Sequence, residues 1–416
     1  MAESPQPTPA RRSEAHPAEE RDQARELSGM ANVSALTFLA ARAVPLGWTV
    51  GVAGGVPLAR AAERHGGRAG YATATASLVE TMAIMGPARM GIPVPHAASA
   101  PLLGLLVRRR SSLLTMAIAG AAVRTGYYAL TSAFSIIVLI GLDAYLGSYE
   151  RLRHTFGFLP AGNAAALWLT FASLVVWSLG AGLIQAWVIR RGLRQWTAGA
   201  SVAALAQPGS ERPAEAQARP HALAFVGLAI AGFAAALAST DARALGVIGA
   251  VLAIAWTFTA AGWRTLARGL ALALPLALST LAFGLVGGIG AGPAARRASR
   301  VALLVLIAVW LHSAAGSQGL RTVSLRLVRR LRCVPTLALV GTVLGASVSA
   351  VDFGGAARRL GGRLRSVARR PTPILDSLLA WLANESSRLA GPEADRAAHS
   401  DAPDRSRRGS QNAPGG

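Results

Sequence analysis

The sequence predicts an all-α, polytopic integral membrane protein with about eight to ten transmembrane helices and further amphipathic helices on the cytoplasmic side. Hydrophobic residues make up 52% of the 416 residues and charged residues only 15%, whereas soluble globular domains carry roughly 25% charged residues. The apolar residues form long runs, such as 163–189 and 269–292, and about 20 apolar residues span a bilayer as a helix. Because these runs lack the alternation of barrel strands, helices are expected.

Arginine clusters follow several of the apolar runs. The net charge is +22, and basic residues gather at 108–110, 190–194 and 321–332. Positive residues beside membrane helices tend to remain in the cytoplasm, so this pattern predicts topology and explains the charge without a nucleic-acid partner. The clusters at 190–194 and 321–332 are expected in the cytoplasm. Arginines at 296–300 do not fit this orientation, because they would lie on the outer side.

Five segments are expected along the chain. Residues 1–30 and 398–416 are polar and are predicted to be disordered tails. Residues 198–220 contain a polar stretch with Pro and Gly, which is typical of a linker. The linker separates a first membrane block, 31–197, from a second block, 221–397. We expect a multi-pass protein of the cell (plasma) membrane, with the linker and both tails in the cytoplasm.

The candidate transmembrane spans are less regular in the first block than in the second. Residues 112–146 are too long for one straight span, so they form either one tilted or kinked helix or two helices. Residues 334–351 contain Gly and Ser and either cross the bilayer or form a re-entrant helix. Residues 374–389 have the spacing of an amphipathic helix. The other spans are expected near 35–59, 70–87, 93–107, 163–189, 221–238, 243–262, 269–290 and 301–319.

Ionisable residues in or beside the apolar runs of the first block are the candidate functional residues. Such groups are costly at membrane depth and tend to face a cavity or one another. Glu80 and Arg124 are predicted to bind substrate or to form pairs, whereas Arg89, His96 and Asp143 either share this role or mark loop ends. The histidines lack metal-ligand spacing and no Walker A motif occurs. We therefore expect no metal, no cofactor and no catalytic residue.

The second block has a distinctive order of features. A basic turn at 264–269 leads into a Leu-rich helix with Pro275, and a later apolar span ends in a small, polar-rich turn at 313–319. A basic helix then leads to an apolar helix that begins with Pro335. In this order the block, over about 221–397, resembles the transmembrane T component of energy-coupling factor transporters, the vitamin and metal importers of prokaryotes.

This resemblance implies a set of coupling residues. The family carries two short motifs of the Ala-Arg-Gly or Ala-Arg-Ser type, whose arginines dock into ATPase subunits. Residues 357–360 (Ala-Arg-Arg-Leu) and 364–366 (Leu-Arg-Ser) are similar to the first motif, and 393–397 (Glu-Ala-Asp-Arg-Ala) are similar to the second with Asp395 inserted. The resemblance implies that the ATPase-coupling residues are Arg365, Ser366, Ala394 and Arg396.

The sequence thus predicts a membrane subunit of an ATP-driven importer for a small molecule such as a vitamin or metal ion. Separate ABC-type ATPase subunits and the lipid bilayer are the expected partners, and the chain itself is not expected to be an enzyme. The size and position of the first block suggest a substrate-capturing unit fused to its coupling partner. The alternative is a membrane scaffold or assembly protein that transports nothing. An enzyme acting on lipid is a weaker third alternative, because no convergent Asp or His motif occurs.

Overall fold

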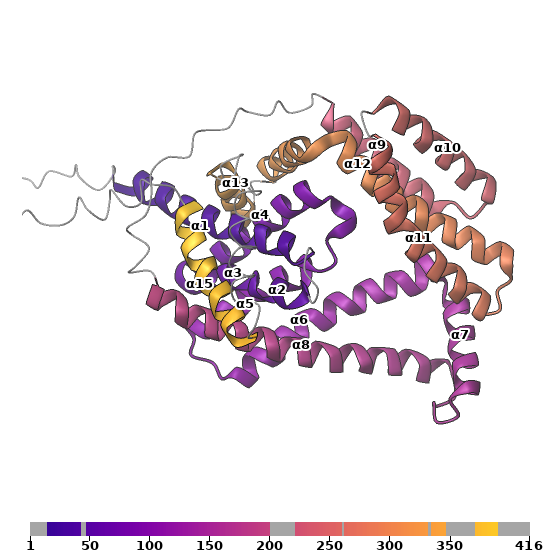
Figure 1. Cartoon of the computed structure of the whole chain (residues 1–416), viewed down its shortest axis with the longest axis horizontal. Coiled ribbons are helices and arrows are strands. Elements are labelled where there is room, and N and C mark those ends of the chain that lie inside the picture. Colours follow the sequence, from indigo (N-terminus) through magenta and orange to yellow (C-terminus); the bar gives the residue numbers. More distant parts are fainter. Residues whose placement is uncertain are drawn as a thin grey trace, which may run out of the picture.

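The computed structural model describes residues 15–42, 47–199, 221–259, 262–331, 334–346 and 371–389, and within these ranges the regular structure is helical without strands. Figure 1 shows the arrangement. The elements are α1 (Ala15–Ala40), α2 (Gly47–Ala53), α3 (Gly55–His65), α4 (Gly67–Met85), η1 (Pro87–Arg89), α5 (Pro93–Arg108), α6 (Leu113–Phe134), η2 (Ser135–Ile140), α7 (Leu142–Thr155), α8 (Asn163–Gly199), α9 (Ala222–Ala238), α10 (Ala242–Phe258), α11 (Trp263–Val286), α12 (Ala291–Arg330), α13 (Pro335–Ala346) and α15 (Pro371–Leu389).

Four helical segments in the described ranges are long and apolar enough to cross a membrane. They are Leu113–Ile140, Asn163–Trp196, Trp263–Val286 and Ala291–Arg330. Large hydrophobic side chains on these segments are widely exposed, as Leu130, Val176 and Leu278 illustrate. The all-α class is therefore confirmed for these ranges. The helices α9 and α10, which correspond to two predicted spans, have only 17 residues each.

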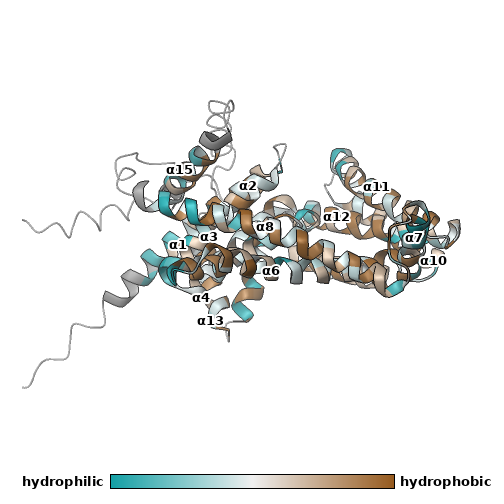
Figure 2. Ribbon diagram, turned by 90° about the horizontal axis from the view of Figure 1, so that it is seen from below, coloured by the Kyte–Doolittle hydropathy of each residue, from teal (hydrophilic) through white to brown (hydrophobic). Residues whose placement is uncertain are grey.

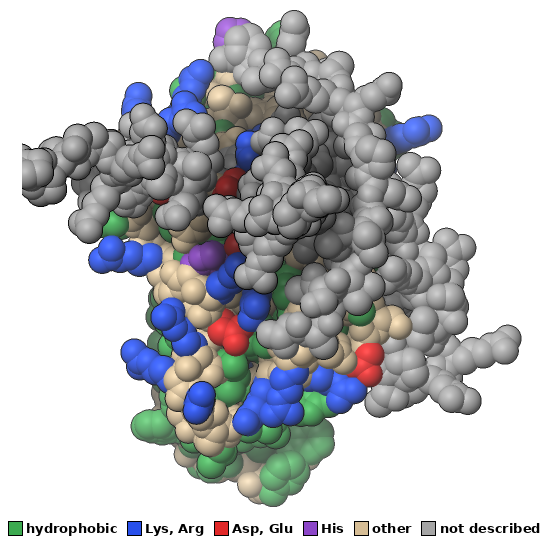
Figure 3. Space-filling model, turned by 90° about the vertical axis from the view of Figure 1, so that its left-hand side faces the viewer, with side chains coloured by type: hydrophobic (Ala, Val, Ile, Leu, Met, Phe, Trp, Pro, Cys, Tyr) green, Lys and Arg blue, Asp and Glu red, His purple; other side chains and the backbone are tan. Residues whose placement is uncertain are grey.

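The helices form a cluster at one end and a more open layer at the other. In Figure 1, α1 to α5, α13 and α15 gather on the left, while α6 and α8 run side by side from this cluster toward α7. The helix α12 runs from the α7 end back to α4 and α13, with α9 and α11 against it. In Figure 2, hydrophilic residues mark α7 at one end and α1 and α15 at the other. Figure 3 shows many Arg side chains, in blue, on the face at the α1 and α15 end.

Two expectations for the start of the chain are wrong. Disorder was expected for residues 1–30, but within the described residues α1 begins at Ala15 and buries Leu27 and Met30 against α4 and α13. Residues 1–14 lie outside the described ranges. A single span was expected over 35–59, but α1 ends at Ala40 and the later residues form α2 and α3. Pro57 lies in the first turn of α3, where its missing N–H is tolerated, and it could not continue a helix from α2.

The 112–146 region is one long helix followed by a turn into a second helix. Ser112 caps α6, since its Oγ accepts a hydrogen bond from the Thr115 backbone N–H at 3.1 Å. The helix continues through the π-helical η2 to Ile140, and Gly141 then turns the chain into α7 with φ of 91°. This resolves the alternatives for the region, because the apolar residues to Ile140 form one candidate span and α7 is a separate helix.

Two of the arginines that conflict with the predicted orientation, Arg297 and Arg300, have structural partners. Arg297 Nη1 donates a hydrogen bond to the Ile140 carbonyl at 2.6 Å, and Arg297 Nη2 donates to the Asp143 carboxylate at 3.0 Å. Arg300 donates to the carbonyls of Val138 and Ser239. These carbonyls lie at helix ends, where the backbone lacks helical partners. The two side chains therefore stabilise the turn between η2 and α7, which accounts for their position without a role in topology.

We expect Gly141→Ala to destabilise the folded chain by at least about 1–2 kcal/mol. Residue 141 has a positive φ, and a Cβ there would meet the Arg297 guanidinium. Thermal unfolding in detergent micelles would measure the change. Gly126→Ala is a matched control, because a Cβ at this position on α6 would meet open space. The control is expected to be neutral or stabilising by about 0.5–1 kcal/mol, and equal effects of both substitutions would contradict the assignment.

Each of the three hydrophobic cores contains residues from both the first and the second block. One core joins α1, α3, α5 and α8 to Leu378, Leu379 and Leu382 of α15. A second joins α1 and α4 to α12 and α13, and a third joins α9, α10 and α12 to Ala83 of α4. The predicted small turn at 313–319 lies within α12, where Gly316, with φ of 69°, kinks the helix. Side-chain burial thus links the described parts of both blocks.

Candidate functional site

A group of polar side chains is fully buried where α5, α6 and α8 meet. It comprises Arg124 of α6, Gln185 of α8, and His96 and Ser99 of α5, each at most 1% exposed. The Gln185 Oε1 atom accepts hydrogen bonds from Arg124 Nε at 3.1 Å, from Arg124 Nη2 at 2.8 Å and from Ser99 Oγ at 2.8 Å. The Gln185 amide donates to the His96 carbonyl at 3.3 Å. We call these four residues the polar cluster.

Small residues let α6 and α8 approach closely enough to form the polar cluster. A Cβ on Gly182 of α8 would lie 2.6 Å from the Ala117 carbonyl oxygen of α6, so only glycine fits this contact. Gly120 of α6 also faces Gly182. One turn beyond these contacts, Arg124 and Gln185 face each other. Close approach through small residues is typical of helices that associate in membranes.

The hydrogen bonds fix the charge and tautomer of His96. The His96 Nδ1 atom lies 2.7 Å from Arg124 Nη2. An arginine side chain can only donate, so Nδ1 is the acceptor and the imidazole is neutral with its proton on Nε2. The single hydroxyl proton of Ser99 points to the Pro95 carbonyl at 2.7 Å or to Gln185 Oε1 at 2.8 Å rather than to the imidazole. The imidazole of His96 is therefore not placed to activate the Ser99 hydroxyl.

The charge of Arg124 is not balanced by an acidic side chain in the described residues. Its partners within the described residues are neutral, namely Gln185, His96 and the Tyr128 phenol. The Nη1 atom of Arg124 has no hydrogen-bond partner among the residues that the structure describes. A buried cation without a counter-ion is unfavourable, and such groups are usually paired. Within the described residues, the polar cluster therefore carries a buried positive charge that no acidic side chain balances.

Aromatic rings lie beside the polar cluster. The ring centroid of Trp48 on α2 lies 6.2 Å from that of His96 and 6.1 Å from that of Trp177 on α8. Trp177 is 56% exposed, whereas His96 is buried. The short helix α2 and its tryptophan thus lie between the buried imidazole and an exposed part of α8.

Glu80 and Arg124 are both buried, but the structure does not bring them together. Glu80 of α4 forms an ion pair with Arg321 of α12, with 2.8 Å between Oε1 and Nε, and the two side chains are 10% and 12% exposed. The Arg321 Nη2 atom also donates to the Leu344 carbonyl of α13 at 2.7 Å. This ion pair joins helices of the first and second blocks and lies outside the polar cluster.

The other predicted residues have separate positions. Asp143 pairs with Arg297, and Arg89 accepts a hydrogen bond from Arg42 through its carbonyl. No group of three potential metal ligands occurs among the described residues. The four predicted coupling residues, Arg365, Ser366, Ala394 and Arg396, lie outside the described ranges.

Two members of the polar cluster were not predicted. Gln185 and Ser99 carry no charge, whereas the candidate residues predicted from the sequence are ionisable. Gln185 is nonetheless the only glutamine in the apolar run 163–189. Polar side chains within such runs face the protein interior or a polar partner, so the position of Gln185 in the sequence already indicates a buried polar contact. No protein-family model, curated protein or solved structure matches the chain, and its function is therefore inferred from its own residues.

Proposed function

We propose that the chain is the membrane subunit of an ATP-driven importer of the energy-coupling factor type, inserted in the cell membrane with about eight to ten spans. Buried, unbalanced Arg124 in the first block is the observation that carries this proposal. An intramembrane ionisable residue is costly and is retained where it binds or conducts a ligand. A purely structural helix contact could use an apolar residue at the same position.

The polar cluster would be the substrate-capturing part of the importer. Arg124 supplies a charged fork of donors, Gln185 and Ser99 orient it, and Trp48 lies toward the exposed part of α8. Guanidinium groups recognise carboxylates and phosphates through paired hydrogen bonds. The substrate class that fits is a small molecule with an anionic group. Its binding would supply the counter-charge that Arg124 lacks among the described residues.

The ion pair between Glu80 and Arg321 would connect substrate capture to the coupling region. Glu80 belongs to α4, which contacts α5, and Arg321 follows the kink at Gly316 in α12. A movement of α5 around bound substrate would therefore shift α4 and, through the Glu80–Arg321 ion pair, α12. The residues that follow α12 and α13 in the sequence contain the motifs that resemble ATPase-docking sites.

The alternative of a membrane scaffold is favoured by one observation. The amphipathic helix α15 is held against α8 by a bidentate ion pair between Asp376 and Arg191, with both N–O distances at 2.8 Å. It also buries Leu379, Trp381 and Leu382 in the core of the first block. A helix bound in this way is less available to a separate ATPase, so partner binding must be tested directly.

The coupling residues provide the test. In the full chain expressed with its ATPases, Arg365→Ala and Arg396→Ala should each reduce the recovered ATPase at least about tenfold, since each removes charge-assisted hydrogen bonds to the partner. Quantitative mass spectrometry of the purified complex would measure recovery. Arg153→Ala on α7 is the control, because this side chain pairs locally with Glu150. Normal recovery and uptake in both coupling variants would reject the assignment.

A further inference from the structure

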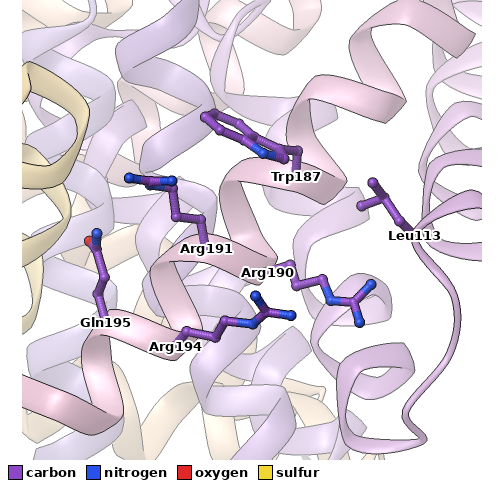
Figure 4. A pocket seen from close by; sticks show the side chains of 6 residues that line it. All are labelled: Leu113, Trp187, Arg190, Arg191, Arg194 and Gln195. Carbon is purple, nitrogen blue, oxygen red and sulfur yellow. The ribbon is translucent and has the colours of Figure 1, made fainter. Parts of the chain in front are cut away.

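Two exposed tryptophans mark the ends of the apolar part of α8. Trp168 is 69% exposed and Trp187 is 44% exposed. They are 19 residues apart, which corresponds to about 28 Å along a helix, and the hydrocarbon core of a bilayer is about 30 Å thick. Trp187 lies beside the arginines at the end of α8, with the Arg191 guanidinium 5.6 Å from its ring centre (Figure 4). In a membrane, Trp187 would therefore mark the boundary on the basic side and Trp168 the opposite boundary.

The helix α7 lies across the Trp168 end of α8. It connects the candidate spans Leu113–Ile140 and Asn163–Trp196, and in Figure 1 it runs across the ends of α6 and α8. The Tyr145 hydroxyl of α7 forms a hydrogen bond with the Thr170 hydroxyl of α8, two residues beyond Trp168. The side of α7 that carries Tyr145 therefore faces α8 close to the level of the Trp168 boundary.

The side chains of α7 sort onto three sides of the helix. One side faces α11, where Ser148 Oγ donates a hydrogen bond to the Phe283 carbonyl at 2.9 Å. A second side carries ionisable groups that interact with one another, namely Glu150, Arg153 and His154. The third side is apolar and aromatic at helical spacing, with Leu142, Tyr145, Tyr149, Leu152 and Phe156. The helix is therefore amphipathic, and its apolar side includes the tyrosine that contacts α8.

Part of the apolar side is an exposed patch at the end of α7. Leu152 is 49% exposed and Phe156 is 46% exposed. The Phe156 N–H donates to the Leu152 carbonyl at 2.8 Å, so the two residues are one helical turn apart on the same side. The ring of Phe158, which is 83% exposed, lies 6.0 Å from the Phe156 ring. The Tyr149 hydroxyl holds the loop after Phe158 by donating to the Pro160 carbonyl at 2.8 Å. We call Leu152, Phe156 and Phe158 the tip patch.

We propose that α7 is an interfacial helix whose tip patch inserts into the bilayer leaflet opposite the arginines of α8. Amphipathic helices at membranes bury their apolar side about 5–10 Å into the boundary between head groups and acyl chains. Lipid is the occupant that fits, because the patch lies between two apolar spans in the sequence and Leu152 is on the same side of α7 as Tyr145. This inference rests on the proposed membrane insertion and not on transport.

The charges of α7 indicate which lipid is needed. The helix contains Asp143 and Glu150 against Arg151 and Arg153, so these acidic and basic side chains balance. Binding of an interfacial helix depends on its buried apolar area and on electrostatic attraction to anionic lipid. With balanced charge only the apolar area contributes, and a zwitterionic lipid such as phosphatidylcholine should be sufficient.

Spin labels on single cysteines test where the tip patch lies. The full chain would carry Cys333→Ser, which removes the one cysteine of the sequence. Leu152→Cys and Phe158→Cys report the tip patch. The matched control on α7 is His154→Cys, because the His154 side chain is 71% exposed and lies on the polar side. In phosphatidylcholine vesicles, electron paramagnetic resonance measures collisions of each label with oxygen, which is enriched in lipid, and with a water-soluble nickel complex.

A further label reports membrane insertion itself. Val176 of α8 is 70% exposed and lies about 12 Å beyond Trp168 along the helix. The label at Val176→Cys is therefore expected deep in the lipid. The labels at Leu152→Cys and Phe158→Cys are expected about 5–10 Å inside the lipid boundary, with more collisions with oxygen than with nickel. The label at His154→Cys is expected in water, with the opposite preference.

Two results at the tip patch would overturn the proposal. Nickel collisions as frequent as those at His154→Cys would place the patch in water. Few collisions with either reagent would mean that a protein surface, such as a second copy of the chain, covers it. If the Val176→Cys label is in lipid, either result leaves the proposed membrane insertion intact, whereas a Val176→Cys label in water would reject insertion and the interfacial helix together. These measurements need no ATPase and do not depend on the importer proposal.

Discussion

Arg321→Ala is expected to destabilise the folded chain by about 3–5 kcal/mol, because it leaves the Glu80 carboxylate buried without its counter-charge. The two side chains are 12% and 10% exposed, and the ion pair joins α12 to α4. Arg321 also loses its hydrogen bond to the Leu344 carbonyl of α13. Thermal unfolding in detergent micelles would show a large decrease in melting temperature. Glu80→Gln should have a smaller effect, since Arg321 retains its bond to Leu344.

A double variant separates the ion pair from general disruption. Glu80→Leu/Arg321→Met removes both charges and is expected to recover most of the lost stability, because replacing a buried pair with apolar residues is often neutral. Arg153→Ala is the exposed control and should leave the melting temperature unchanged, since exposed pairs contribute little. An effect of Arg321→Ala as small as that of Arg153→Ala would contradict the burial of this pair.

Gln185→Leu is expected to destabilise the folded chain clearly more than Arg124→Met, although both substitutions remove the same contact. Gln185→Leu leaves Arg124 charged and deprives its Nε and Nη2 atoms of their shared acceptor, which should cost about 2–4 kcal/mol. Arg124→Met removes the buried charge and keeps most of the volume. It should therefore leave stability within about 1 kcal/mol of the wild type or raise it.

Measuring both stability and uptake for Arg124→Met tests whether Arg124 is retained for function. If Arg124 binds substrate, Arg124→Met is expected to be stable and correctly assembled but to lose uptake in the reconstituted importer. Ser178→Ala is a control for the same face of the fold, because Ser178 is also buried on α8 and lies two turns from Gln185. This variant should keep both stability and uptake. A strongly destabilised Arg124→Met protein would instead indicate a structural role.

Much of the helical fold could be predicted from the sequence. The apolar runs 163–189 and 301–319 lie within α8 and α12, and the run 269–290 covers α11 to its end at Val286 and the turn that follows, because length and hydropathy together specify a long apolar helix. The start of the chain was harder to predict. The polar residues of α1 give no apolar run before Leu27, and this helix is stabilised by contacts with α4, α13 and α15 that local sequence does not reveal.

The candidate site could be predicted only in part. Arg124, His96 and Glu80 are ionisable groups in apolar surroundings, and their cost at such positions identified them. Their partners come from distant segments, since Gln185 lies 61 residues after Arg124 and Arg321 lies 241 residues after Glu80. Pairing over such distances depends on how helices contact one another. For example, the contact between Gly182 and Ala117 aligns α6 with α8, and spacing along the chain does not encode it.

The most direct test of the central proposal is the composition of the complex that the wild-type chain forms in its own membranes. The full chain would be tagged, extracted from the native host in mild detergent, and analysed by quantitative mass spectrometry. The importer proposal predicts that ABC-type ATPase subunits are recovered in a fixed ratio to the chain and that the complex hydrolyses ATP. Recovery of the intact chain from the membrane fraction without any ATPase, at all detergent conditions that keep it folded, would contradict the proposal.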